Sequence, residues 1–333
     1  MSILTAPPMN RTHAAQLFTP IARDLVEVER VFHATLESSR PGVDQLIAHL
    51  GNYKGKRLRP ALLLLTARAC GGIEPAHHTL GAVVEMIHTA TLVHDDVLDS
   101  ASVRRHVPTV NALWGNQASI LLGDYLFTQA FHLSATLDDV RACRIIGAAT
   151  NRLCEGELHQ ITSRGRLDLS ESEYYDIIDA KTAELTACCC KLGAMYAGMP
   201  DDVIANLTDY GQSLGLAFQI ADDLLDIEGV EAKAGKSLGT DLEQQKLTLP
   251  LIWLLENAPK DQRDRVRSIL TAAGNHKREA LLPELRSSGA LAYARREAES
   301  HAAAACAKLE CLPASPERAI LAVLAEQAVH RDH

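Results

Sequence analysis

The chain has 333 residues, of which 47% are hydrophobic and 23% are charged, and its formal net charge is −9. This composition is typical of a globular protein, and the acidic balance argues against nucleic acid as a partner. The N-terminus lacks a basic segment followed by an apolar one, and no apolar run reaches about 18 residues, so we expect neither a signal peptide nor a transmembrane segment. The eight cysteines form no Cys-x-x-Cys pair, and we expect them to be reduced in a cytoplasmic protein.

Aromatic residues make up only 4% of the chain, so the core must consist mostly of Leu, Ala, Ile and Val, which favours packed helices. Apolar residues recur at three- and four-residue spacing almost throughout. We predict long helices over residues 60–70, 77–100, 109–136, 139–163, 174–197 and 201–228, a shorter helix from Pro250 and a last one from Pro316. Alternating strand patterns with Asn-Gly or Asp-Gly turns do not occur. We therefore expect an all-α protein of roughly ten or more helices, folded as one domain over residues 1–333.

Two aspartate triplets stand inside predicted apolar helices. Each has two adjacent aspartates and a third three residues later, and the triplets consist of Asp95, Asp96 and Asp99, and of Asp222, Asp223 and Asp226. The spacing places the three carboxylates of a triplet on one side of a helix within a single turn, where like charges destabilise it. A bound cation would offset that repulsion. Oxygen ligands without His or Cys favour Mg²⁺, which shares its coordination with water and substrate phosphates.

The alternative interpretation is a solvated acidic face, and two other pairs in the chain fit it. Asp138-Asp139 and Asp201-Asp202 both lack a third aspartate, and both lie near predicted helix starts, where the helix dipole favours acids. Two complete triplets in the middle of apolar helices are better explained by a metal site.

Basic residues follow or precede these acidic segments. Gly55-Lys56-Arg57-Leu58-Arg59-Pro60 concentrates three cations ahead of a helix N-terminus, where backbone N–H groups and Arg side chains suit a diphosphate. The other candidates for polyphosphate contacts are Arg104, Arg105, Lys181, Thr182, Lys236 and Lys246. His88 lies seven residues before Asp95 on the same helix face; either it is a core histidine or it donates to a phosphate oxygen. We expect His94 to be structural.

The motifs together resemble one known family, the trans-isoprenyl diphosphate synthases or polyprenyl synthetases. The resemblance extends over nearly the whole chain and rests on GKRLRP, DDVLD followed by two arginines, Gly123-Asp124, EGELHQ at 155–160, KTA at 181–183, FQIADDLLD, and Lys236 followed by Lys246-x-Thr-Leu-Pro. The segments around the first triplet are most similar to the long-chain members, especially octaprenyl diphosphate synthases.

The resemblance implies the isoprenoid synthase fold, with antiparallel helices around a deep central cavity, usually in a homodimer. It implies head-to-tail condensation of an allylic diphosphate with isopentenyl diphosphate, with three Mg²⁺ ions held by the six triplet aspartates. The residues implied at the allylic diphosphate are Arg104, Lys181, Thr182, Gln219, Lys236 and Lys246, with Lys181 also catalytic, and those at isopentenyl diphosphate are Lys56, Arg59, His88 and Arg105. The resemblance also implies brief membrane contact when product is released. Terpene cyclases and head-to-head synthases would not need the second basic group, and a non-catalytic subunit would be expected to lose aspartates or cations.

Four further positions refine this expectation. His106 and Gln245 stand where Gly is common in the family, and neither departure removes a predicted ligand. Ala90 and Thr91 precede Asp95 by five and four residues, about one helix turn, and we expect a growing chain to meet them first. Both are small, which predicts a long product of about eight isoprene units (C40); the alternative is a short-chain farnesyl or geranylgeranyl diphosphate synthase.

Overall fold

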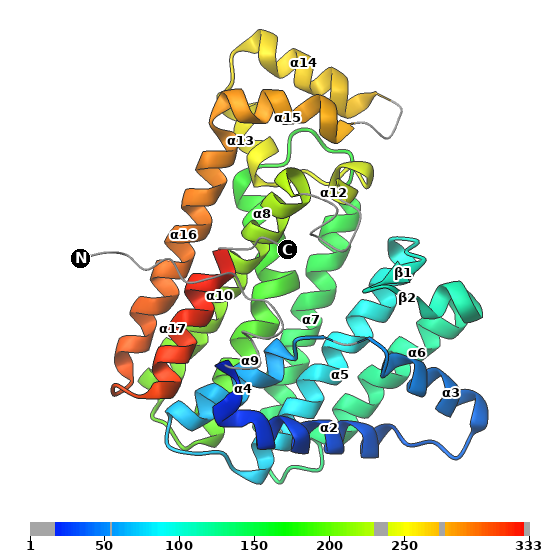
Figure 1. Cartoon of the computed structure of the whole chain (residues 1–333), viewed down its shortest axis with the longest axis vertical. Coiled ribbons are helices and arrows are strands. Elements are labelled where there is room, and N and C mark those ends of the chain that lie inside the picture. The colour runs from blue at the N-terminus through cyan, green and yellow to red at the C-terminus, as the bar shows by residue number, and fades with distance from the viewer. Residues whose placement is uncertain (1–16, 54, 230–238, 273–276, 330–333) are drawn as a thin grey trace.

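The computed structural model of the chain describes residues 17–53, 55–229, 239–272 and 277–329 (Figure 1). In chain order the helices are η1 (Thr19–Ile21), α2 (Ala22–Leu36), α3 (Pro41–Leu50), α4 (Leu58–Ala69), α5 (Pro75–Leu98), α6 (Val110–Ser134), α7 (Val140–Thr162), α8 (Glu171–Ile178), η2 (Asp179–Ala183), α9 (Glu184–Tyr196), α10 (Asp201–Glu228), α12 (Thr240–Glu243), α13 (Leu249–Asn257), α14 (Lys260–Thr271), α15 (Lys277–Ser288), α16 (Ala290–Lys308), η3 (Leu309–Cys311) and α17 (Pro316–Val329). The predicted all-α class is confirmed.

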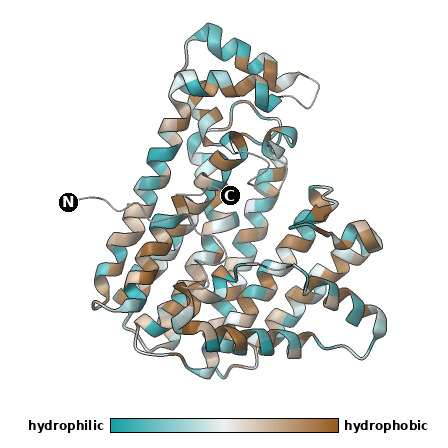
Figure 2. Cartoon of the chain, viewed as in Figure 1, coloured by the Kyte–Doolittle hydropathy of each residue, from teal (hydrophilic) through white to brown (hydrophobic). Residues whose placement is uncertain are grey.

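Long helices run side by side through the centre of the molecule, while α14 and α15 lie across one end and α2 crosses the other (Figure 1). The core consists of apolar faces of these long helices together with α4, whose residues from Pro60 to Ala67 are all buried. Hydrophobic residues gather in the central helices, whereas the outer α14 is mostly hydrophilic (Figure 2). The three adjacent cysteines, Cys188, Cys189 and Cys190, are buried in α9, and all eight cysteines are free, as the sequence predicts.

Local signals in the sequence set several helix ends. Ser170 and Glu173 form the predicted capping box at the start of α8, and Thr109 caps α6 by accepting from the Ala112 N–H. Arg318 N–H donates to the Ser315 hydroxyl at 3.0 Å, which caps α17. These side chains accept hydrogen bonds from backbone N–H groups that have no partner within the helix.

The segment predicted as one helix over 174–197 begins earlier and is interrupted by η2, a π-helix. Two glycines allow α7 and α10 to approach η2 closely. A Cβ at Gly156 of α7 would lie 2.7 Å from the Ala180 Cβ, and a Cβ at Gly215 of α10 would lie 2.4 Å from the Ala183 Cα. π-turns of this kind are often found at functional sites, and this one carries Lys181 and Thr182.

A small antiparallel ribbon follows α5, although the sequence shows no strand pattern. It consists of β1 (Val103–Arg104) and β2 (Val107–Pro108), with Arg104 opposite Val107. Arg105 and His106 form the turn with φ of 51° and 67°. Two positive φ values are what a two-residue hairpin turn needs, and Gly or Asn usually supplies them, which is why the turn escaped prediction. Among the described residues, no helix combines the length and the apolar character that crossing a membrane requires.

Candidate functional site

A cavity of about 1580 Å³ opens between the helices, and most of the predicted site residues line it. Its wall includes parts of α5, α7, η2 and α10, the β1–β2 ribbon, the segment before α4 and residues 240–248. Apolar side chains such as Phe127, Leu153 and Phe218 share the wall with charged ones. The wall of this one cavity thus has both charged and apolar parts.

The first triplet lies at the end of α5 and presents two of its three carboxylates to the cavity. Asp95 and Asp99, one turn apart, line the wall, whereas Asp96 is only 1% exposed and does not. Asp96 instead accepts from the Arg104 Nε at 2.7 Å. Burial raises the pKa of Asp95 to about 6, and burial also raises the pKa of Asp96. The helix rotates by about 100° between adjacent residues, which separates Asp96 from the face that the other two share.

The second triplet lies near the end of α10 and presents its adjacent pair. Asp222 and Asp223 line the cavity, but Asp226 is 2% exposed and does not. Asp226 accepts from the Thr240 hydroxyl and from the Asp241 N–H, both at 3.2 Å. In this structure Asp96 and Asp226 are turned into the protein, where Arg104 of β1 engages Asp96 and the first two residues of α12 engage Asp226.

Asp223 is the most enclosed carboxylate of the cavity wall. It accepts from the Tyr174 hydroxyl at 2.7 Å and from the Gln219 Nε2 at 2.8 Å, and burial raises its pKa well above the usual range. Gln219 in turn accepts from the Thr182 hydroxyl at 2.7 Å. The predicted residues Thr182 and Gln219 thus form a hydrogen-bonded relay from the π-helix to the second triplet.

Lys246 connects the two acidic segments. Its Nζ lies 3.9 Å from the Asp99 Oδ1 and 3.7 Å from the Asp241 Oδ1, while the Asp241 N–H binds Asp226. Lys246 therefore lies between Asp99 of the first triplet and Asp241 of α12, which binds the second triplet. Residues of both triplets thus line one cavity, with Lys246 between Asp99 and the segment that binds Asp226.

Lys181 projects from η2 into the same region. Its Nζ lies 2.5 Å from the Glu157 Oε2 and donates to the Gln160 Oε1 at 2.9 Å. Burial alone would lower the pKa of Lys181, but the charges of Asp95 and Glu157 raise it above its ordinary value. The side chain is therefore a fixed cation beside the first triplet.

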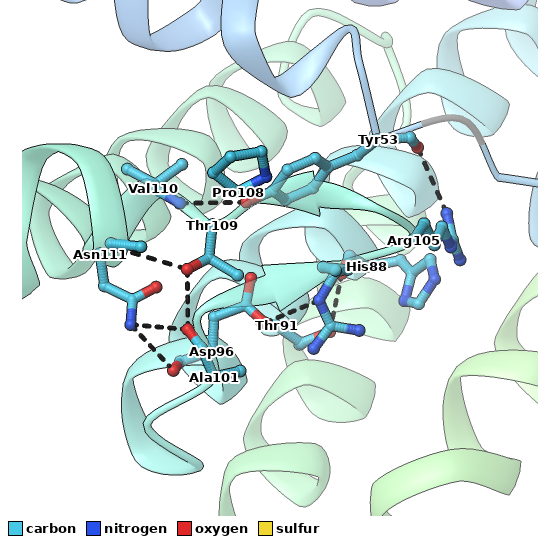
Figure 3. A network of polar contacts seen from close by, with 12 residues as sticks. Tyr53, His88, Thr91, Asp96, Ala101, Arg105, Pro108, Thr109, Val110 and Asn111 are labelled. Carbon is cyan, nitrogen blue, oxygen red and sulfur yellow. Dashed lines mark hydrogen bonds and ion pairs between the residues drawn. The ribbon is translucent and has the colours of Figure 1, made fainter. Parts of the chain in front are cut away.

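The second basic group gathers at the N-terminus of α4. Lys56, Arg59, His88 and Arg105 all line the cavity there. The Arg59 Nε is buried without a hydrogen-bond partner among the described residues, and burial lowers the pKa of Arg59. Burial and the surrounding arginines hold the pKa of His88 well below its usual range, so that its ring is neutral. Figure 3 shows Arg105 reaching back to the Tyr53 carbonyl, at 3.2 Å, close to His88.

Two of the predicted residues are not among those that line the cavity. Thr91 lines the cavity, but Ala90 is fully buried in the core and does not. Five residues turn a helix by about 500°, which leaves Ala90 about 140° from Asp95 around the helix axis. Lys236 lies outside the described residues.

The donor set suits a shared metal ion. Within the described part of the chain, no three His, Cys, Asp or Glu side chains lie close enough to hold an ion by themselves. Four cavity carboxylates on two helices are hard oxygen donors that suit Mg²⁺, an ion that keeps waters and completes its coordination on phosphate. The residues present therefore fit Mg²⁺ bound together with a diphosphate.

Several residues at the site were not among the predicted ones. Glu157 and Gln160 lie within the EGELHQ motif, so the motif itself was the available signal. Arg164, whose Nη2 lies 3.4 Å from the Asp99 Oδ1, and Asp241 had no comparable signal. Tyr174 looks like a core residue in sequence, and only the fold shows that its hydroxyl donates to Asp223.

Comparisons with known proteins agree with this geometry. The family described as polyprenyl synthetase matches residues 40–285. The chain is 37% identical to octaprenyl diphosphate synthase of Escherichia coli (strain K12), over 93% of this chain and 97% of the relative. It is 38% identical to a short chain isoprenyl diphosphate synthase of Methanothermobacter thermautotrophicus, over 86% of this chain and 89% of the relative. Among solved structures, polyprenyl synthase from Caulobacter crescentus CB15 complexed with calcium and isoprenyl diphosphate superposes with a TM-score of 0.89 at 35% identity, covering 98% of this chain and 100% of the other.

Proposed function

The chain belongs to the polyprenyl synthetase family and is a prenyltransferase, a trans-polyprenyl diphosphate synthase, and on this premise we propose that it adds successive isopentenyl diphosphates head to tail to an allylic diphosphate to make a product near C40. The main support for the proposal is that two separate basic groups and residues of both aspartate triplets line one cavity, which also has apolar side chains in its wall. A terpene cyclase has one diphosphate to bind and would not need the second basic group.

The allylic diphosphate is assigned to the end of the cavity where the triplets meet. Arg104, Lys181, Thr182, Gln219, Lys236 and Lys246 would contact it or shape its site. Asp95, Asp99, Asp222 and Asp223 would hold Mg²⁺, three ions when the diphosphate is bound, which supplies positive charge to stabilise the leaving diphosphate. Lys181 and Lys246 add fixed positive charge in the same place, and such preorganised groups act most strongly on charge that develops in the transition state.

Isopentenyl diphosphate is assigned to Lys56, Arg59, His88 and Arg105. The Arg59 Nε, which has no hydrogen-bond partner among the described residues, and the neutral His88 ring are already withdrawn from water in the folded protein. A diphosphate would therefore gain hydrogen bonds from both donors without displacing another partner. The helix N-terminus of α4 adds its own attraction for anions.

The reaction then follows from these positions. The allylic C–O bond breaks and diphosphate leaves; the alkene of isopentenyl diphosphate forms the new C–C bond with the allylic cation; and a proton passes to the released diphosphate. The apolar wall, including Leu153 and Phe218, keeps water from the cation. This sequence requires no protein nucleophile.

Product length is assigned to the cavity wall below Asp95. Thr91 is small and lies on that wall, which leaves room for a long chain. The similarity to both a long-chain and a short-chain relative means that identity alone does not fix the length. We expect Thr91→Phe to shorten the product distribution, as measured by chromatography of the dephosphorylated lipids, and an unchanged distribution would contradict this assignment.

We further propose that the chain acts as a single catalytic domain in a cytoplasmic homodimer that contacts membranes only when product is released. Exposed apolar side chains on α6, Leu121 at 67% and Leu113 at 51%, support a protein partner on that helix. Sedimentation of the purified chain tests the dimer. Activity of that single chain also excludes the rival proposal of a non-catalytic subunit.

The decisive experiment incubates the purified chain with labelled isopentenyl diphosphate, farnesyl diphosphate and Mg²⁺, and then sizes the lipid by mass spectrometry. We expect a ladder ending near C40. Asp95→Asn should lower kcat by about 10²-fold or more, because its stabilising role grows in the transition state. Asp138→Asn, in an acidic pair without a third aspartate, is the matched control and should keep wild-type activity. Lack of lipid product from wild type would refute the proposed function.

A further inference from the structure

Arg57 stands between Lys56 and Arg59, the two residues of this segment that are assigned to isopentenyl diphosphate, and all three line the cavity. Arg57 differs from its neighbours because carboxylates hold its guanidinium on two sides. Its Nε and Nη2 donate to the two carboxylate oxygens of Glu29, the second bond at 3.3 Å, and its Nη1 donates to the Glu85 Oε1 at 2.6 Å. A diphosphate would have to displace these carboxylates to reach Arg57, so this cation is already engaged within the protein.

The partners of Arg57 come from two helices other than α4. Glu29 belongs to α2, and Glu85 belongs to α5. The Arg57 Cζ also lies 5.9 Å from the centre of the buried Phe32 ring of α2, a cation–π contact. Helix α2 crosses one end of the long helices (Figure 1), and it precedes residue 40, where the match to the polyprenyl synthetase family begins. Arg57 therefore joins the segment before α4 to both α2 and α5.

The backbone of Arg57 explains why this anchor matters. Arg57 is the N-cap of α4 and has φ of 50° and ψ of 38°, a left-handed conformation that a Cβ disfavours, so contacts elsewhere must hold it. Lys56 and Arg59 lie one residue before and two residues after, and both would shift if Arg57 relaxed. Glu85 precedes His88 by three residues on the same side of α5, so the anchor also ties this segment to the helix that carries His88.

We propose that Arg57 is a positioning residue: its ion pairs with Glu29 and Glu85 fix the segment before α4 at the isopentenyl diphosphate site. The inference rests on the proposed function, because it takes the second basic group to bind isopentenyl diphosphate. It assigns Arg57 itself no contact with substrate. Helix α2 thereby contributes to the site through Glu29, although Glu29 is not among the described residues that line the cavity.

Glu29→Gln tests the proposal through the sign of its effect. If Arg57 were a direct ligand, removing a carboxylate that competes for it would strengthen diphosphate binding. Positioning predicts the opposite: we expect the KM for isopentenyl diphosphate to rise about 3- to 10-fold, with the KM for farnesyl diphosphate changed less than about 2-fold. The Glu29 side chain is 35% exposed, so the variant should fold.

Two substitutions of Arg57 complete the test. Arg57→Lys keeps the charge but loses the planar fork that binds two carboxylates at once, so we expect it to raise the KM for isopentenyl diphosphate at least as much as Glu29→Gln does. Arg57→Gln removes both ion pairs. In that background Glu29→Gln should no longer raise this KM, because its partner is already lost.

Arg68→Gln and Glu317→Gln are the matched controls. Their ion pair joins the opposite end of α4 to α17, with the Arg68 Nε 3.0 Å from the Glu317 Oε1, and neither is among the described residues of the cavity wall. Each should leave both KM values unchanged. Calorimetric binding of isopentenyl diphosphate, in Mg²⁺ and saturating farnesyl thiodiphosphate as a slowly reacting analogue, gives a second readout. In it Glu29→Gln should weaken binding by the same factor as it raises the KM, and the controls should not.

Each outcome separates the inference from the proposed function. If wild type makes no polyprenyl product, the proposed function itself fails. If wild type is active and Glu29→Gln lowers the KM for isopentenyl diphosphate, then Arg57 is a direct ligand and the inference is overturned. It is also overturned if Glu29→Gln leaves this KM unchanged, raises both KM values equally, or acts no differently from Glu317→Gln, because the ion pair is then structural only. If the Arg57 variants do not fold, Glu29→Gln still decides between these outcomes.

Discussion

The contact between α10 and the π-helix η2 gives a quantitative prediction for Gly215→Ala. An alanine Cβ at this position would lie 2.4 Å from the Ala183 Cα and 2.8 Å from the Ala183 Cβ. Carbon atoms in contact normally stay about 3.5–4.0 Å apart, so η2 must move by about 1 Å. The atom in the way belongs to the backbone, which no side-chain rotation can relieve.

The expected cost follows from two opposing effects. Overpacking of a core costs about 1–3 kcal/mol, and we take the upper end because backbone must shift. Ala is better than Gly inside a helix by up to about 1 kcal/mol, which offsets part of the loss. We therefore expect Gly215→Ala to lower the free energy of unfolding by about 2 kcal/mol.

Gly147→Ala in α7 provides the matched control. The nearest atom to its Cβ would be the Phe131 Cε1 at 4.0 Å, an ordinary contact, so the substitution should stabilise the protein by about 0.5–1 kcal/mol. Urea unfolding followed by circular dichroism measures both. Because η2 carries Thr182, Gly215→Ala should also raise the KM for the allylic diphosphate. Equal stability of the two variants would refute the close-packing argument.

Three further outcomes are expected. Replacing His106 or Gln245 by Gly should stabilise the protein by up to about 1 kcal/mol each in urea unfolding, because φ is 67° and 57° there; a loss of stability would show that their side chains matter more than the strain. Ser170 and Arg166 hold the pKa of Glu173 at about 2 against an ordinary 4.5, so its stabilisation is present above pH 4.5 and is lost as pH falls toward 2. The melting-temperature difference between wild type and Glu173→Gln should shrink over that range, and a constant difference would contradict the linkage. A maleimide should label Cys154, exposed and on the cavity wall, before the buried cysteines, and farnesyl diphosphate should slow that labelling; equal labelling with and without ligand would argue against occupancy there.

Much of the helical fold could be read from the sequence because local signals agreed with one another. The apolar periodicity of 201–228 continues without interruption and becomes α10, and the caps at Thr109 and Ser170 fix the starts of α6 and α8. The site residues were found for a related reason, since an acidic triplet inside an apolar helix is costly without a cation and therefore conspicuous.

The remaining features depend on contacts between distant segments. The π-helix η2 arises where Gly156 and Gly215 let two helices approach, and no local pattern encodes that meeting. The β1–β2 ribbon turns through Arg105 and His106, which have no intrinsic preference for positive φ. Thr91 lines the cavity and Ala90 does not, because four residues bring a helix back to nearly the same face and five do not.

The same long-range contacts explain why the two triplets differ in the carboxylates that they expose. Each triplet gives one aspartate to a neighbouring segment: Asp96 holds Arg104 of β1, and Asp226 holds Thr240 and Asp241 at the start of α12, shortly before Lys246. Both segments bring cations to the cavity, so the buried aspartate of each triplet ties a cation-bearing segment to the helix whose other carboxylates line the cavity. A spacing of two adjacent aspartates and a third one turn away therefore has two roles, since it supplies two carboxylates that line the cavity and one that anchors a neighbouring segment.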